Sequence, residues 1–178
     1  MAILNMAKWL IARRDTRKDR RIPNVLNRIH EVYHILNMLL RETKCVRALI
    51  LRAENGGEVP IVGKDLYSSV VYEVYDRAFD SIKARWQKRP LDEDYIDLLL
   101  EVSKEGKAVL ITEEMAPCAL KDLYVSIGLH GSVVLKLKAR EGAFYYLALN
   151  FDQPFDGDDA GLNESVAFAV NEIASLLD

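Results

Sequence analysis

A seam of aliphatic side chains between residues 24 and 43 constrains this chain more than any other feature. In NVLNRIHEVYHILNMLLRET the seam residues recur at alternating spacings of four and three: Val25, Ile29, Val32, Leu36 and Leu39. This spacing is typical of a coiled-coil stripe. With Asn24 as its N-cap, the segment Asn24–Thr43 is predicted to form one continuous helix.

A second stripe beside the seam widens the apolar surface of this helix. Leu26, Tyr33 and Leu40 recur every seven residues. A helix that is apolar over so much of its circumference must contact two partners, such as its own sheet and another helix. We therefore expect the seam from Val25 to Leu39 to form the interface of a homodimer, because it would otherwise face water.

Residues 1–23 differ from the rest of the chain in charge. Met1–Arg21 holds seven Lys or Arg and two Asp, which gives this segment +5, whereas the whole chain carries −3. Pro23 is expected to break or restart the helix. We therefore predict two parts, a basic amphipathic extension over 1–23 and a domain over 24–178.

The basic stretch Arg13–Arg21 suggests two kinds of partner, an anionic membrane surface or nucleic-acid phosphates. Asp15 and Asp19 interrupt the positive run, which favours a solvated helix that extends the dimer interface.

Composition and cysteine usage indicate one domain in a reducing compartment. A chain of 178 residues with 50% hydrophobic content is long enough for one sizeable core. The apolar residues at the N-terminus precede the basic cluster, which reverses the order of a secretory signal. Cys45 and Cys118 lack the spacing of a zinc or redox pair. We expect a cytoplasmic protein.

Strand and helix patterns alternate after the first helix. Two strands flank a turn at Asn55-Gly56-Gly57, and a second antiparallel pair flanks Glu141-Gly142. Between these pairs lie a segment that is helical or irregular and three regular ones: Asp76–Arg89, the helix LDEDYIDLLLEVSKEGK, the strand KAVLITEEM and the short helix APCALKDLYVSIG. A helix in NESVAFAVNEIASLLD closes the chain.

This order resembles that of the GAF sensory domains over Asn24–Asp178. The local similarities lie in RALILRAENGG, KAVLITEEM, LKDLYVSIG and GSVVLKLKAREGAFYYLALNFD. The resemblance implies an α+β fold with a central antiparallel sheet of five or six strands. The N- and C-terminal helices should pack on one face, and shorter helices and loops should cover the other. The related PAS fold is the nearest alternative.

The resemblance also implies a small-molecule pocket between the sheet and a cover made by Asp76–Glu105 and Met115–Gly128. The candidate pocket residues are Tyr67, Tyr72, Tyr75, Trp86, Cys118 and Tyr124. The ligand stays unknown, because Asn150-Phe151-Asp152 lacks the Lys and Glu of the cyclic-nucleotide signature. Ala119 follows Cys118 where bilin-attaching members commonly have His, and two cysteines are too few for the members that reduce methionine sulfoxide.

We expect neither a catalytic nor a metal site. His30 and His34 share a helix face without an evident third ligand, and Asp152, Asp156, Asp158 and Asp159 lack the spacing of a calcium loop. No phosphate loop, GxGxxG or GxSxG occurs. Cys118, at the start of a short helix, is the candidate nucleophile, but no partner base is evident.

These observations support three hypotheses. The first is a GAF-like small-molecule-binding regulatory module that acts as a homodimer and signals to a separate output protein. The second is a ligand-free GAF-like scaffold for dimerisation or protein docking, and the third is a thiol-dependent enzyme using Cys118. A scaffold should fill the pocket with bulky side chains, whereas a sensor should keep an enclosed cavity with a few polar groups.

Overall fold

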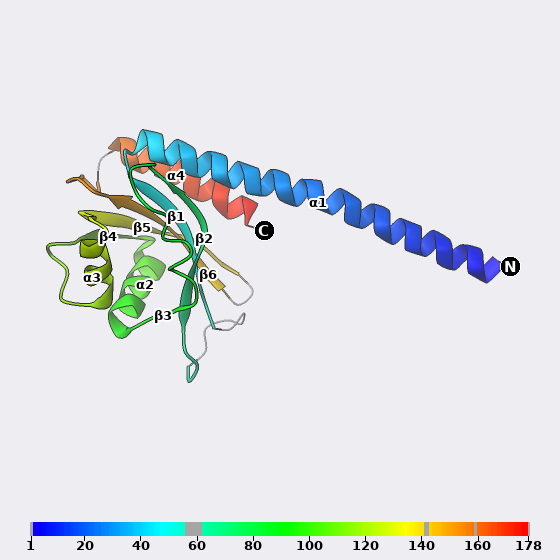
Figure 1. The fold of residues 1–178 in the computed structure, drawn as a ribbon, viewed down its shortest axis with the longest axis horizontal. Coiled ribbons are helices and arrows are strands. Elements are labelled where there is room, and N and C mark those ends of the chain that lie inside the picture. The colour runs from blue at the N-terminus through cyan, green and yellow to red at the C-terminus, as the bar shows by residue number, and fades with distance from the viewer. Residues whose placement is uncertain (1, 56–61, 141–142, 159, 178) are drawn as a thin grey trace.

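The structure is a computed structural model that describes the backbone of residues 2–55, 62–140, 143–158 and 160–177. Within these ranges it describes the side chains of 22–55, 62–137, 143–158 and 164–177. One antiparallel sheet of six strands lies between two helical layers (Figure 1). The elements in chain order are α1 (Ala2–Glu42), β1 (Arg47–Glu54), β2 (Tyr67–Tyr75), β3 (Arg89–Pro90), α2 (Glu93–Glu105), β4 (Lys107–Ile111), α3 (Ala119–Ser126), β5 (Gly131–Arg140), β6 (Ala143–Phe151) and α4 (Ala160–Leu176).

The sheet has the strand order β3-β2-β1-β6-β5-β4, with β1 and β6 at its centre. Helices α1 and α4 pack on one face, and α2, α3 and the 76–89 segment cover the other (Figure 1). These findings confirm the predicted fold class. The 76–89 segment is irregular, and the two-residue strand β3 at its end was not predicted. The residues of both predicted turns lie outside the described ones, except Asn55.

Successive residues of β1 point to opposite faces of the sheet, as strand geometry requires. Leu49 and Leu51 join the cluster beneath α2 and α3, which we call the cover-side core. Ala48 and Ile50 join the cluster beneath α1 and α4, which we call the helix-side core. Because both faces of β1 are buried, its sequence RALILRAE is mostly apolar and does not alternate with polar residues.

Helices α1 and α4 lie side by side and run antiparallel. Arg28 Nη2 donates to the Ser175 carbonyl oxygen at 3.1 Å, and Ser165 Oγ donates to Glu42 Oε2 at 2.8 Å. These two contacts align α4 with residues 28–42 of α1. The portion of α1 that precedes Arg28 therefore extends beyond α4.

The predicted dimer seam is wrong for three of its five residues. Val32, Leu36 and Leu39 are buried in the helix-side core of their own chain, so they are not available to a second copy. Ile29 is half-buried, and Val25 is exposed. The alternating spacing showed that this face of the helix is buried, but an intramolecular sheet and an intermolecular helix require the same periodicity.

The prediction that Pro23 breaks the helix is also wrong. Helix α1 is continuous over 41 residues and contains Pro23. A proline lacks one backbone donor, but the turns before and after it retain their hydrogen bonds. The N-terminal half of α1 projects away from the body (Figure 1). The division into 1–23 and 24–178 stays a prediction. No helix among the described residues has the length and hydropathy needed to span a membrane.

Truncating one buried and one exposed side chain of α1 tests which face packs on the sheet. We expect Leu36→Ala to lower the free energy of unfolding by about 2–5 kcal/mol, because the Leu36 side chain is fully buried. Val25→Ala should change it by about 0.5 kcal/mol or less, as is usual at the surface. Urea denaturation followed by circular dichroism measures both values. Equal effects would contradict the assigned faces.

Candidate functional site

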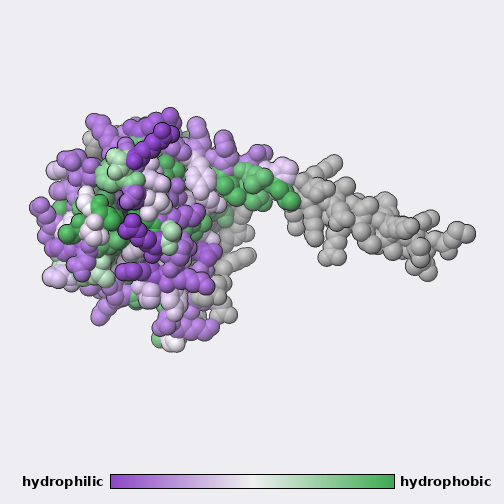
Figure 2. Space-filling view, in the orientation of Figure 1, coloured by the Kyte–Doolittle hydropathy of each residue, from purple (hydrophilic) through white to green (hydrophobic). Residues whose placement is uncertain are grey.

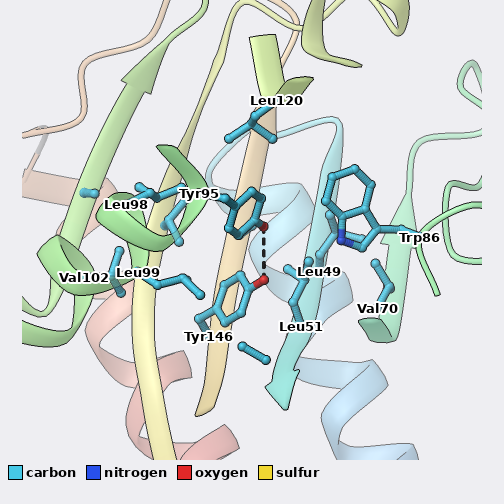
Figure 3. Close-up of a cluster of buried hydrophobic side chains, with 14 of the residues drawn as sticks. Leu49, Leu51, Val70, Trp86, Tyr95, Leu98, Leu99, Val102, Leu120 and Tyr146 are labelled. Carbon is cyan, nitrogen blue, oxygen red and sulfur yellow. Dashed lines mark hydrogen bonds between the residues drawn. The ribbon is translucent and has the colours of Figure 1, made fainter. Parts of the chain in front are cut away.

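The candidate site is the interior between the sheet, α2, α3 and the 76–89 segment (Figure 3). Trp86, Tyr95 and Tyr146 occupy its centre, and leucines from the sheet and both helices surround them. The remaining free space is about 30 Å³. A cavity needs roughly 10–15 Å³ of such space to hold one water molecule, whereas ligand pockets usually hold about 300–1,000 Å³. The interior is therefore filled by the protein's own aromatic side chains.

A buried network of hydroxyl groups joins these aromatic residues. The Tyr146 hydroxyl lies 3.0 Å from the Tyr95 hydroxyl and 2.6 Å from Ser68 Oγ. Trp86 Nε1 donates to the same Ser68 oxygen at 3.4 Å. Figure 3 shows the Tyr95 and Tyr146 hydroxyls pointing toward one another, with the Trp86 ring beside them. Each polar atom of this network thus has a partner within the protein, which is what burial of such groups requires.

A second pair of hydroxyl groups lies in the same interior. The Tyr124 hydroxyl is 2.6 Å from Ser132 Oγ, and both residues are buried. Asn150 lines the free space, and its buried Oδ1 has no hydrogen-bond partner among the described residues. An unpaired buried acceptor is costly, so this oxygen has unused capacity for a water or ligand donor.

Burial controls the ionisation of the interior tyrosines. It raises the pKa of Tyr124 and of Tyr146 to about 12, and it raises the pKa of Tyr95 well above its ordinary value. All three are neutral near pH 7, and so they serve there as hydrogen-bonding groups and not as bases. This arrangement supplies packing and hydrogen bonds without an ionised nucleophile.

A buried ion pair attaches the 76–89 segment to the sheet. Arg47 Nε lies 3.2 Å from Glu73 Oε1, and both side chains are 2% exposed. The Glu73 carboxylate accepts hydrogen bonds from the backbone nitrogens of Ile82 at 2.9 Å and Lys83 at 3.0 Å, and from the Ser81 hydroxyl. Arg47 Nη2 donates to the Asp80 carbonyl oxygen at 2.6 Å. These bonds hold residues 80–83 over the sheet and so position Trp86.

Two of the six predicted pocket residues, Trp86 and Tyr124, line the interior. Their role in binding a ligand stays a prediction. Tyr67 is the first residue of β2, between β1 and β3, with its hydroxyl 3.2 Å from Asp65 Oδ2, and Tyr75 is exposed at the other end of β2. Cys118 is the N-cap of α3, where its sulfur accepts from the Lys121 backbone nitrogen at 3.4 Å.

Tyr72 is misplaced by the prediction because β2 contains an irregularity. Ser68 and Val70 face the cover, and a regular strand would place Tyr72 beside them. The pairing instead shifts between Ile50 and Leu51, which turns Tyr72 to the opposite face. Its ring lies 5.5 Å from that of Tyr33 on α1.

Several residues of the interior were missed by the sequence-based prediction. Tyr95 shares one helical face with Leu98, Leu99 and Val102, and this spacing in LDEDYIDLLLEV is a signal that it points inward. No spacing in the sequence marks Arg47, Glu73 or Tyr146 as interior residues, because each lies in a strand whose two faces are both covered. Their partners come from distant parts of the chain.

The remaining candidates for chemistry stay apart in the structure. Among the described residues, no group of three His, Cys, Asp or Glu side chains is placed to hold a metal ion. His30 and His34 are exposed on α1. Burial raises the pKa of the Cys45 thiol to about 11, so this cysteine is unreactive near neutral pH.

Comparison with known proteins finds similar folds among solved structures. No protein-family model and no curated protein matches the chain. Among solved structures, a far-red cyanobacteriochrome photoreceptor matches with a TM-score of 0.64 at 13% identity, over 94% of this chain and 96% of its own. A GAF domain from Synechocystis sp. in its photoproduct state matches with a TM-score of 0.61 at 11% identity, over 84% of this chain and 92% of its own.

A GAF domain/HD domain protein from Geobacter sulfurreducens is a third similar structure. It matches with a TM-score of 0.54 at 15% identity, over 83% of this chain and 92% of its own. Identities this low concern the fold alone. The chain therefore has a GAF-like fold, as the order of its elements predicted.

Stability at high pH should report the buried tyrosines. An exposed tyrosine ionises near pH 10, whereas Tyr124 and Tyr146 keep their protons to about pH 12 in the folded chain. The unfolded chain thus releases protons first, so the two tyrosines should make stability fall between pH 10 and 12, and Cys45, whose pKa is raised to about 11 in the folded chain, should make the fall begin near pH 9. Tyr124→Phe should reduce this slope by about 1 kcal/mol per pH unit. Denaturant titrations from pH 9 to 11.5 measure it.

Tyr75→Phe is the matched control for this experiment, because the Tyr75 side chain is exposed at the end of β2. Equal slopes for all three proteins would show that Tyr124 is not buried as described.

Removing the charge of Glu73 should loosen the cover. We expect Glu73→Gln to lower the free energy of unfolding by about 3–5 kcal/mol, because it leaves Arg47 buried without a counter-charge. Hydrogen exchange should accelerate at the amides of Ile82 and Lys83. Asp158→Asn is the control, since Asp158 pairs with Lys107 at an exposed position and such pairs contribute about 1 kcal/mol or less. Unchanged exchange at 82–83 in Glu73→Gln would refute the attachment.

Proposed function

We propose that this protein is a GAF-like regulatory module that acts through protein contacts on its helical layer, with the interior between sheet and cover serving as a packed core. The observation that carries this proposal is the free space of about 30 Å³ left around Trp86, Tyr95 and Tyr146. This space is about a tenth of the smallest usual ligand pocket, which holds about 300 Å³. A tetrapyrrole or nucleotide would have to displace these side chains and break their hydrogen bonds.

Exposed apolar side chains on the helical layer, which α1 and α4 form, also support the proposal. Ile22, Val25 and Leu26 on α1 and Phe168 on α4 are exposed large apolar side chains. Figure 2 shows an apolar area on α1 where the helix leaves the body. Exposed apolar groups that gather on one element are typical of protein contact sites. We place the homodimer contact and the contact with a separate output protein on this layer, in the cytoplasm.

A second candidate function is a sensor of a small molecule, and the unpaired Asn150 Oδ1 favours it. A ligand with one hydrogen-bond donor would satisfy this acceptor if the cover moved outward to admit it. Cyanobacterial phytochrome GAF domains of similar fold hold phycoerythrobilin or phycocyanobilin. In this chain Cys118 caps α3 and Ala119 follows it, so we do not extend bilin attachment to it.

Ligand binding separates the two candidates. Native mass spectrometry of the protein purified from its own cells should give the mass of the unmodified chain alone. Thermal shift assays with biliverdin, cyclic nucleotides and indole should leave the Tm unchanged. A reproducible rise in Tm that Asn150→Leu abolishes would overturn the scaffold proposal and establish the sensor. Ser126→Ala, an exposed change on α3, is the control for nonspecific effects.

A further inference from the structure

We propose that a cleft beside β2 binds a small phosphate monoester, whose phosphoryl oxygens contact Arg52, Lys83 and Lys88. The cleft has a volume of about 440 Å³ and is lined by residues of β1, β2 and the 76–89 segment. This volume lies within the usual range of ligand pockets, which is about 300–1,000 Å³. The site goes beyond the proposed function, because none of its residues lines the free space beneath the cover.

Positive charge distinguishes this cleft from the rest of the body. Its lining contains the three cations and one carboxylate, that of Glu54, so its net charge is +2. Because the chain carries −3 and Met1–Arg21 carries +5, residues 22–178 carry −8. A phosphate monoester carries about −1.5 to −2 at pH 7 and so neutralises such a cleft. A monocarboxylate carries a single charge and leaves the cleft positive. The charge balance therefore favours a phosphate.

Strand β1 supplies Arg52 and Glu54 on the helix-side face of the sheet. They continue the alternation of Ala48 and Ile50, which belong to the helix-side core. Arg52 Nη2 donates to Glu54 Oε1 at 2.6 Å, and the two side chains are 37% and 12% exposed. Glu54 thus orients the guanidinium. It also occupies a donor that a phosphate would otherwise use, so its carboxylate competes with an added anion.

Lys83 reaches the same face around the edge of β2. Its backbone nitrogen donates at 3.0 Å to the carboxylate of Glu73, which lies on the cover side. Its Nζ lies 6.0 Å from the centroid of the Tyr72 ring, which lies on the helix side. The lysine therefore crosses the edge of the sheet. Gln87 Nε2 donates to the carbonyl oxygens of Val70 at 2.9 Å and Lys83 at 2.7 Å, which fixes the backbone of this lysine against β2.

Lys88 is held beside Arg52. Ser69 pairs with Arg52 in the register of β1 and β2, so these two side chains lie on one face. The Ser69 Oγ accepts from the Lys88 backbone nitrogen at 2.9 Å. The φ of Lys88 is 48°, a left-handed conformation that is uncommon outside glycine and persists only where the surroundings determine it. The backbones of all three cations are thus fixed before a ligand arrives, which lowers the entropic cost of binding.

The chemistry of the lining suits a phosphoryl group with a short apolar tail. A guanidinium presents a planar fork to phosphate oxygens, and each ammonium group adds a point charge. Val71, half-buried where the register of β2 shifts, provides an apolar wall. A bound phosphate would also link Arg52 on the sheet to Lys83 and Lys88 on the 76–89 segment. Binding should therefore strengthen the attachment of this segment.

Titration of the isotope-labelled full chain with butyl phosphate at constant ionic strength tests the site. We expect saturable shifts of the backbone amide signals of Arg52, Lys83 and Lys88 in NMR spectra. Pentanoate carries the same butyl group on a carboxylate and is the matched comparison. It should bind about tenfold more weakly, because it makes fewer charge-assisted hydrogen bonds. Inorganic phosphate should shift the same signals and bind more weakly than butyl phosphate, since it lacks the contact with Val71.

Single substitutions separate specific binding from a general effect of charge. Lys83→Gln and Lys88→Gln should each raise the dissociation constant of butyl phosphate about tenfold, since each removes a charge-assisted hydrogen bond. Glu54→Gln should lower it about threefold, because it removes the competing carboxylate. Such a gain in affinity does not arise from misfolding. Lys104→Gln makes the same change of charge at an exposed position of α2 and should have no effect.

Hydrogen exchange provides a second readout. Butyl phosphate should slow exchange at the amide of Lys88, which donates to Ser69, because a ligand that binds the folded site stabilises it. Absence of saturable shifts would overturn the inference, as would equal affinities of Lys83→Gln and Lys104→Gln. Tighter binding of pentanoate than of butyl phosphate would assign the cleft to carboxylates. None of these results concerns the interior beneath the cover, so failure of this site and failure of the scaffold proposal are distinguished.

Discussion

The two central strands are buried on both faces, and the rest of the architecture follows from this constraint. β1 and β6 have neighbouring strands at both edges, so their backbone groups are satisfied within the sheet. Their side chains need an apolar layer on either side, because neither face reaches water. α1 and α4 provide one layer. α2, α3 and the 76–89 segment provide the other, and a loss from either layer exposes the same strands.

The two layers are held by different interactions. On the helix side, aliphatic residues such as Leu36 and Ile173 pack without polar contacts from their side chains. On the cover side, an irregular segment has few apolar residues of its own, and the Arg47 to Glu73 pair binds its backbone. A buried ion pair contributes little net stability compared with apolar packing, but it selects one position for the segment that it binds. The cover-side core therefore depends on polar specificity.

Sequence patterns predicted the fold well, because the spacing of apolar residues still distinguishes helices from strands when these elements are buried. They predicted the first helix, the helix within LDEDYIDLLLEVSKEGK and both strand pairs. They failed where geometry depends on distant partners. The spacing of Leu36 did not reveal whether a sheet or a second chain covers it. The irregularity beside Tyr72 reverses the faces of part of β2 without any glycine or proline to mark it.

The projecting half of α1 has a mechanical consequence. About 20 residues of straight helix form an arm of roughly 30 Å whose base is packed on the sheet. A tilt of about 5° at the base therefore displaces the free end by about 2.5 Å, which is comparable with the shifts that change helix packing. Any tilt at the base is thus magnified at the tip, as in a lever arm.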